Sequence, residues 1–204
     1  MTAKVKICGI TSVADALLAA EAGADAIGLV FYPHSPRFVE AGAAREIVRA
    51  LPPFVSPVGV FVNEAPATVE ELCTAAGIRI VQLHGSEEPE YVEQLPEYRV
   101  IKAIRVGRAE DLLAARQYRV SAVLLDSKVE GLWGGSGRSF DWTLARQLNA
   151  RIILAGGLAP DNVAQAIRLV KPYAVDVSTG VEAAPGRKDP ALVRAFVAAV
   201  RTAR

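Results

Sequence analysis

The chain has 204 residues, 51% of them hydrophobic, and its 23 basic and 22 acidic side chains give a formal charge of +1. This length predicts one domain with a substantial core, and neither the charge nor any apolar run, all far below the roughly 20 residues of a membrane span, points to nucleic acid or a membrane as partner. Two cysteines without metal-ligand spacing and only two histidines argue against a metal site, so we expect a cytoplasmic protein with reduced thiols.

Eight short β-branched runs alternate with helical stretches along the chain. The runs are Val5–Cys8, Ala26–Phe31, Val58–Val62, Ile78–Leu83, Val100–Ile104, Ala122–Asp126, Ile152–Ala155 and Ala174–Val177. Such alternation is typical of a parallel sheet, and eight units in about 200 residues match the short end of the (β/α)8 range. A doubly wound open sheet usually has fewer strands and a GxGxxG turn, which is absent after Cys8. We therefore predict a single α/β domain over residues 1–204, a (β/α)8 TIM barrel.

The stretches between the runs carry helical signals. Examples are "SVADALLAAEAGA", "PATVEELCTAAGI" and "APDNVAQAIRLVK". Several open with Ser, Asp or Pro and close on Gly, as helices do. Ala14, Leu17 and Leu18 fall on one helical face, and Val69, Leu72 and Cys73 fall on another.

Residues at strand ends carry special weight, because active sites of such barrels lie at the carboxyl ends of the strands. The residues at these ends are Cys8, His84, Asp126, Gly156 with Gly157, and Ser178, Thr179 and Gly180.

The first strand points Lys6 and Cys8 into the barrel, because side chains alternate along a strand and Val5 packs outward. A buried lysine needs an anionic partner. Asp176 of the eighth strand faces inward by the same alternation, so we predict a Lys6–Asp176 pair. Free cysteines are more often inert packing residues, which is our interpretation of Cys73. Cys8, at a strand end beside a cation that favours the thiolate, is instead predicted to do chemistry.

The loop "FYPHSPRFV" follows the second strand and carries Arg37. Loop arginines are usually just solvated. Two prolines stiffen this loop, however, and a guanidinium held near the barrel mouth suits a bidentate grip on a carboxylate.

Two more polar residues close strands four and six. His84 in "VQLHG" could line the pocket or make a structural hydrogen bond, and both interpretations stay open. Asp126 closes "SAVLLD" and either caps the following turn or forms an acid–base pair with Cys8 across the mouth.

Glycine-rich loops follow the last three strands. "GLWGGSGRSFDW" after the sixth suggests a lid or a plain flexible connector. "LAGGL" places Gly156 and Gly157 after the seventh strand, and "VDVSTGVE" places Ser178, Thr179 and Gly180 after the eighth. Backbone N–H groups and hydroxyls at such turns cradle phosphate, and strands seven and eight often bind it in barrels.

Taken in order, "KICGIT", "GLVFYPHSPRFV", "VGVFVN", "VQLHG", "LLDS", "GGSGRSFDW", "LAGGL" and "VDVSTGVE" resemble the phosphoribosylanthranilate isomerase family of tryptophan biosynthesis. The resemblance runs from Lys4 to beyond Pro185. A strand-one cysteine combined with a strand-six aspartate is its most specific feature, since Gly-Gly phosphate loops are common to many barrels.

The resemblance implies an Amadori rearrangement of an aminoaldose phosphate, with Cys8 as general base and Asp126 as general acid. It assigns Arg37 to the anthranilate carboxylate and the Gly156–Gly157 and Ser178–Gly180 turns to phosphate, and we place His84 and Asp176 beside the substrate. It implies a phosphorylated small-molecule partner and neither metal nor organic cofactor. A homodimer is left open.

Two alternative functions remain, and each predicts a different set of residues in the sequence. A sibling sugar-phosphate barrel, of the epimerase or indole-forming synthase type, would share the fold and the phosphate loops. The epimerase usually shows metal-ligating histidines at strand ends, and the synthase uses strand-end lysine and glutamate. A non-catalytic phosphosugar-binding barrel predicts loss of the acid or base, yet Cys8 and Asp126 are both present.

Overall fold

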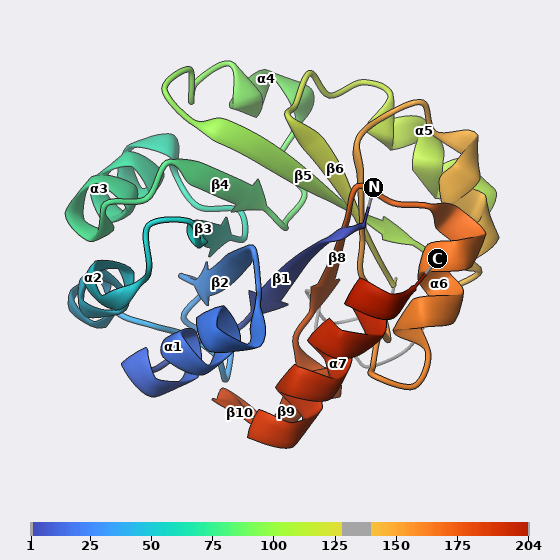
Figure 1. Ribbon diagram of the computed structural model, residues 1–204. Coiled ribbons are helices and arrows are strands. Elements are labelled where there is room, and N and C mark those ends of the chain that lie inside the picture. The colour runs from blue at the N-terminus through green and yellow to red at the C-terminus, as the bar shows by residue number, and fades with distance from the viewer. Residues whose placement is uncertain (1, 128–139, 204) are drawn as a thin grey trace.

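The computed structural model describes residues 2–127 and 140–203, and its centre is a closed barrel of parallel strands that runs from β1 to β8 in chain order (Figure 1). The strands are β1 Lys4–Cys8, β2 Ala26–Val30, β3 Ser56–Phe61, β4 Ile80–Leu83, β5 Arg99–Val106, β6 Ala122–Ser127, β7 Ile152–Leu154 and β8 Ala174–Val177. Every predicted run overlaps one of these strands, with ends that differ by up to two residues. β1 pairs with β8 and closes the barrel, so the predicted TIM barrel is confirmed.

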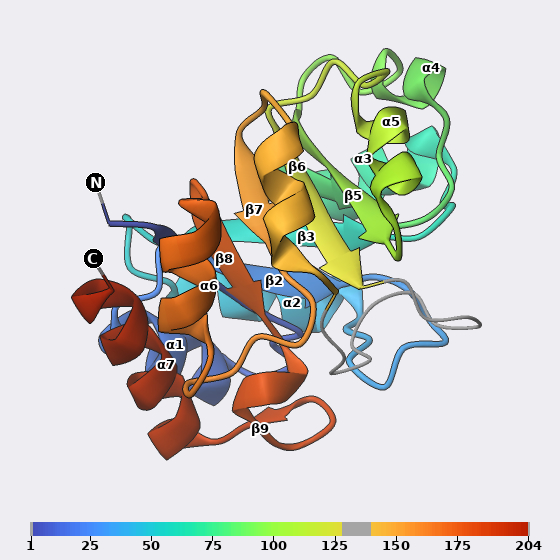
Figure 2. The ribbon, with the colours of Figure 1, turned by 90° about the vertical axis from the view of Figure 1, so that its right-hand side faces the viewer.

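Helices surround the strands on the outside (Figures 1 and 2). The longer ones are α1 Val13–Ala22, α2 Ala41–Ala50, α3 Pro66–Ala76, α6 Val163–Val170 and α7 Pro190–Thr202. Their ends follow the sequence signals: the Ser12 side chain accepts from the Asp15 N–H at the start of α1, and Gly23 ends it with φ 98°. Among the described residues no helix is long and apolar enough to cross a bilayer.

The outer layer is thin beside β5 and β6, where the expectation of a full helix after every strand is wrong. The helical segments there are α4 Pro89–Val92, η1 Ala109–Asp111, α5 Leu112–Ala115 and η2 Trp142–Gln147. Pro89 and Pro96 confine the first of these segments, since proline is tolerated at a helix start but not in its interior. After β8 the chain forms η3 Thr179–Val181 and a small hairpin of β9 Glu182–Ala184 and β10 Arg187–Lys188.

The core has two layers. Val5 and Ile7 of β1 pack outward against the helices, as predicted, whereas Ile101, Leu124 and their neighbours fill the barrel interior. The face shared by Ala14, Leu17 and Leu18 is not the most buried face of α1, although Leu18 packs against the core. Ala16 and Ala19 are its buried residues, and Ala14 is exposed. Small alanine side chains let α1 approach the sheet closely, so the larger leucines lie at the flanks of the contact.

Candidate active site

A pocket of about 670 Å³ opens at the carboxyl ends of the strands. Its size falls within the ~300–1,000 Å³ of typical small-molecule sites. All of the residues that the sequence singles out for chemistry or binding line it, namely Cys8, Arg37, His84, Asp126, Gly156, Gly157, Asp176, Ser178, Thr179 and Gly180. The barrel therefore brings together side chains that lie up to 172 positions apart in the chain, from Cys8 to Gly180.

A buried ion pair joins Asp176, which lines the pocket, to Lys6. Lys6 Nζ donates to Asp176 Oδ1 at 2.8 Å, with both side chains less than a tenth exposed. The two residues lie opposite each other in the β1–β8 ladder, so the predicted pair is confirmed. Burial disfavours the ammonium of Lys6, but Asp176 and Cys8 together outweigh burial and raise the pKa of this lysine. Lys6 is therefore a permanent cation beside the pocket.

Cys8 lies at the end of β1 with 8% of its surface exposed. Burial raises the pKa of its thiol above the ordinary value, and the nearby cations Lys6 and Lys188 lower it without cancelling burial. The sequence-based expectation of a favoured thiolate is thus right about the direction of the Lys6 effect and wrong about the net result. Gly28 of β2 makes room for the sulfur, since a Cβ there would lie 2.6 Å from Cys8 Sγ.

Asp126 sits near the end of β6 and is held by one of its two oxygens. Oδ1 accepts the Ser127 N–H at 2.8 Å, whereas Oδ2 lies 3.3 Å from His84 Nε2, without the geometry of a hydrogen bond. His84 in turn contacts the Gln82 amide nitrogen through Nδ1 at 2.8 Å. Gln82 is fully buried and was not singled out in the sequence, where it looks like an ordinary strand residue.

The turns after β7 and β8 pack against each other. Gly156 and Gly157 have φ values of 79° and 65°, in the left-handed region that favours glycine. Gly180 is needed for packing, because a Cβ there would overlap the Leu158 carbonyl oxygen. Ser178 Oγ is enclosed and has no hydrogen-bond partner in the described part of the chain. The arrangement leaves a donor at the place where a phosphate cradle was predicted.

Arg37 already grips a carboxylate of its own chain. Its Nε donates to Glu182 Oε1 at 2.9 Å and its Nη2 to Glu182 Oε2 at 2.7 Å. Lys188 Nζ approaches the same Oε1 at 2.8 Å. Sequence reasoning missed both Glu182 and Lys188. The one available signal was a set of charged residues inside the Gly/Pro-rich stretch "GVEAAPGRK".

The predicted lid and a possible metal site are the two remaining features. The predicted lid, "GLWGGSGRSFDW", lies almost wholly outside the described residues. Within the described ranges, no group of three or more His, Cys, Asp or Glu side chains could hold a metal ion.

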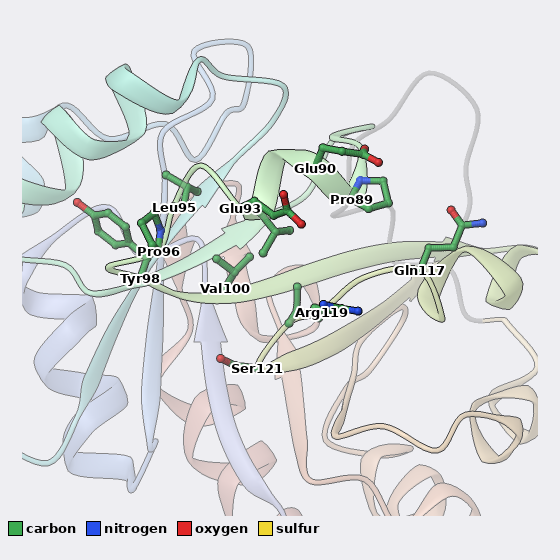
Figure 3. Close-up of a pocket in the computed structure, with 12 residues that line it drawn as sticks. Pro89, Glu90, Glu93, Leu95, Pro96, Tyr98, Val100, Gln117, Arg119 and Ser121 are labelled. Carbon is green, nitrogen blue, oxygen red and sulfur yellow. The ribbon is translucent and has the colours of Figure 1, made fainter.

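A second hollow, of about 430 Å³, lies at the opposite end of the barrel, where the outer layer is thin. Figure 3 shows side chains of the segment 89–98 on one side and those of residues 117–121 on the other. Val100 and Ser121 mark it as lying at the starts of β5 and β6. It contains none of the predicted site residues, and barrel chemistry belongs to the other end.

Comparisons with known proteins agree on one family. Residues 5–199 match the family model of N-(5'phosphoribosyl)anthranilate (PRA) isomerase. An N-(5'-phosphoribosyl)anthranilate isomerase of Trichlorobacter lovleyi is 54% identical over 197 residues, which cover 95% of this chain and 96% of that protein.

Solved structures extend the likeness to three dimensions. The phosphoribosyl anthranilate isomerase of Thermotoga maritima superposes with a TM-score of 0.92 at 44% identity and covers 98% of both chains. A phosphoribosyl anthranilate isomerase in complex with reduced 1-(o-carboxyphenylamino)-1-deoxyribulose 5-phosphate has a TM-score of 0.89 at 43% identity, with 98% of both chains covered.

Proposed function

The chain belongs to the N-(5'-phosphoribosyl)anthranilate isomerase family, and we propose that Cys8 and Asp126 carry out the proton transfers of that isomerisation. The protein is an isomerase of tryptophan biosynthesis, which converts N-(5'-phosphoribosyl)anthranilate to 1-(2-carboxyphenylamino)-1-deoxyribulose 5-phosphate. The observation that carries the residue assignment is that one pocket holds Cys8, Asp126, Arg37 and the two glycine-bearing turns.

The first step opens the ribose ring. Protonated Asp126 gives its proton to the ring oxygen, the C1′–O bond breaks, and the nitrogen lone pair forms a protonated Schiff base at C1′. This role suits Oδ2, the oxygen without a hydrogen bond among the described residues. The Ser127 N–H keeps the other oxygen, and therefore the carboxyl plane, in place.

The second step moves a proton from carbon. The Cys8 thiolate removes the C2′ proton, the electron pair forms a C1′–C2′ double bond, and the iminium electrons return to nitrogen. The Asp126 carboxylate takes the O2′ proton of the resulting enolamine and the Cys8 thiol returns a proton to C1′, which gives the ketone and restores the protonated acid and the thiolate. The protonated imine is the electron sink, so atoms and electrons balance within the substrate and the two side chains.

The two charged ends of the substrate are assigned to different groups of the pocket, on the loops that follow β2, β7 and β8. The turns at Gly156–Gly157 and Ser178–Gly180 would receive the phosphate, supported by the positive φ of the glycines and by the unpartnered Ser178 hydroxyl. Arg37 would receive the anthranilate carboxylate, since a guanidinium binds carboxylates with charge-assisted hydrogen bonds.

Asp176 and His84 fit supporting roles beside the substrate. Asp176 neutralises Lys6, which lies next to Cys8, and His84 lies within 3.3 Å of the Asp126 oxygen that faces the chemistry. The family membership leaves no reason to retain the epimerase, the synthase or the non-catalytic barrel as readings of this chain.

Assembly and location are also proposals. A Thermotoga maritima relative is described as dimeric, which supports a homodimer for this protein. A biosynthetic role on a small phosphorylated molecule supports a cytoplasmic location. Sedimentation equilibrium of the purified protein tests the homodimer, and a monomer at micromolar concentration contradicts it.

The activity itself has a direct assay. Purified protein is mixed with freshly made phosphoribosylanthranilate, and loss of substrate fluorescence is followed. We expect turnover by the wild-type protein and loss of most of that turnover with Cys8→Ala or Asp126→Asn. Full turnover by either variant would overturn its assigned role while leaving the family membership intact.

A further inference from the structure

The Arg37 guanidinium is committed along one edge. A guanidinium carries five N–H donors. Nε and one donor of Nη2 point to the two oxygens of Glu182, and Nη2 also donates to Thr179 Oγ1 at 3.2 Å. No described residue accepts a hydrogen bond from Nη1. A ligand can therefore approach the Arg37 guanidinium at the edge formed by Nη1 and Nη2. Nη1 is free of described acceptors there, whereas Nη2 already donates to Glu182 and Thr179.

Glu182 is placed to serve two cations at once. Its side chain is 4% exposed, that of Arg37 is 13% exposed, and that of Lys188 is fully enclosed. Burial opposes the Glu182 carboxylate, but Arg37 and Lys188 outweigh burial and keep the pKa of Glu182 below its ordinary value. Burial lowers the pKa of Lys188 although Glu182 opposes this shift, and with Lys188 protonated one carboxylate between two cations leaves a single positive charge, which suits one ligand carboxylate.

Two further contacts fix where this charge sits. Gly9, directly after Cys8, supports the Arg37 stem: a Cβ there would lie 2.5 Å from Arg37 Cδ. Lys188 Nζ also approaches the Ser178 carbonyl oxygen at 3.3 Å. Glu182 and Lys188 thus connect the arginine to the turn proposed to hold phosphate.

We propose that Glu182, supported by Lys188, is a positioning residue that holds the Arg37 guanidinium by its Nε–Nη2 edge and presents Nη1 to the substrate carboxylate. The inference rests on the carboxylate clamp proposed above. It assigns to "GVEAAPGRK" a role in substrate specificity, because the hairpin that carries it sets the orientation of the clamp. A competing arrangement is that Glu182 blocks Arg37 and must be displaced by the ligand.

Two ligands separate these arrangements. The first is reduced 1-(o-carboxyphenylamino)-1-deoxyribulose 5-phosphate, and the second is its counterpart made from aniline, which lacks only the carboxylate. Calorimetry gives the ratio of their dissociation constants for each variant. The ratio reports the carboxylate contact, and a general loss of stability does not change it.

The variants are chosen to keep the fold and the charge balance. Glu182→Gln keeps the shape of the side chain and removes its charge. The double variant Glu182→Gln with Lys188→Met removes one charge of each sign, so it remains a test if the single variant fails to fold. Glu87→Gln is the matched control, because Glu87 is an equally buried carboxylate that pairs with Lys102 at 2.7 Å and does not line the pocket.

We expect the preference for the carboxylate ligand to fall roughly tenfold in Glu182→Gln and in the double variant, the size of one charged hydrogen bond. The KM for substrate should rise with little change in kcat, and Glu87→Gln should keep the wild-type ratio. An unchanged ratio in both folded Glu182 variants, or tighter binding of the carboxylate ligand, overturns the positioning role. If Arg37→Ala itself leaves the ratio unchanged, the clamp fails instead, and the two failures are thereby distinguished.

Discussion

The two sides of the pocket hold their charged groups in different ways. On the side of β1, β2 and β8, Lys6 pairs with Asp176, and Glu182 pairs with Arg37 and Lys188, all at 2.7–2.9 Å. On the side of β4 and β6, Asp126 Oδ2 has no hydrogen bond among the described residues and lies 3.3 Å from His84.

The difference separates permanent charge from exchangeable protons. Ion pairs at such distances hold their members ionised, and they suit a side that binds anions and positions a base. A carboxyl oxygen without a fixed donor suits a group that gives up a proton and recovers it in each turnover. The predictions below test the paired side, which holds the base Cys8 and the proposed anion contacts, against the side that holds the acid Asp126.

The largest expected effect follows removal of the two groups that exchange protons. Cys8→Ala and Asp126→Asn should each lower kcat by roughly 10²–10⁴-fold, the contribution of a positioned acid or base. Thermal melting should show that both variants stay folded. The matched control is Cys73→Ala, which removes the other buried cysteine from α3, away from the pocket. If Cys73→Ala and Cys8→Ala lose activity equally, the loss is structural.

A substitution at Gly156 should disturb the position of Asp126 without replacing that residue. A Cβ at this position would collide with the Ser127 side chain and approach Asp126, and the positive φ adds strain. We expect Gly156→Ala to lower kcat on the order of 10²-fold, because small misplacements of reacting groups cost that much. Steady-state kinetics with a melting curve measure it.

Gly42→Ala is the control for that experiment. Gly42 is exposed in α2 and has nothing within 4 Å of an added Cβ. Alanine should therefore keep activity and raise the free energy of unfolding by roughly 0.5–1 kcal/mol. Equal activity of the Gly42 and Gly156 variants would mean that the turn after β7 does not position Asp126.

How much of the fold and of the candidate site could be predicted from the sequence depends on how far apart in the chain the contacting residues lie. The barrel follows from local periodicity, and Cys8 and Asp126 follow from their places at strand ends, so alternation and topology were enough for both. Glu182 meets Arg37 across 145 positions, from a hairpin strand of three residues that has no periodic signal. No local rule predicts which carboxylate reaches that arginine.

The remaining errors have the same origin. The pKa of Cys8 depends on the depth of burial, whereas the sequence shows only that a lysine is nearby. The buried face of α1 consists of small alanines and could not be read from its leucines, because tertiary packing determines which side of the helix meets the sheet. Sequence patterns identified the groups at the site, and long-range packing decided their environment.

A tenfold effect is expected at the anion-binding side. Ser178→Ala removes the unpartnered hydroxyl at the proposed phosphate turn, and inorganic phosphate should then inhibit roughly tenfold more weakly, as for loss of one hydrogen bond to a charged group. Ser178 is a cleaner choice than Gly180, where any side chain would collide with Leu158. Ser121→Ala, at the far end of the barrel, is the control. Equal inhibition constants for all three proteins would show that Ser178 does not contact phosphate.

The smallest expected effect is a shift in the pH at which Cys8 loses its proton. Because burial raises the pKa of this thiol above the ordinary 9.0, the protein keeps the proton on Cys8 at pH values where a free thiol has lost it. Alkylation by iodoacetamide, which needs the thiolate, should therefore reach half its maximal rate above pH 9.0 in a Cys73→Ala background.

Lys6→Met should move this midpoint to higher pH. Lys6 lowers the pKa of Cys8, and its loss also leaves the Asp176 carboxylate unpaired beside the sulfur. Lys102→Met breaks the buried Lys102–Glu87 pair, which lies away from Cys8, and should leave the midpoint in place. A midpoint below pH 9.0, or a midpoint that Lys6→Met leaves unchanged, would mean that burial and the charges beside β1 and β8 do not determine the pKa of Cys8.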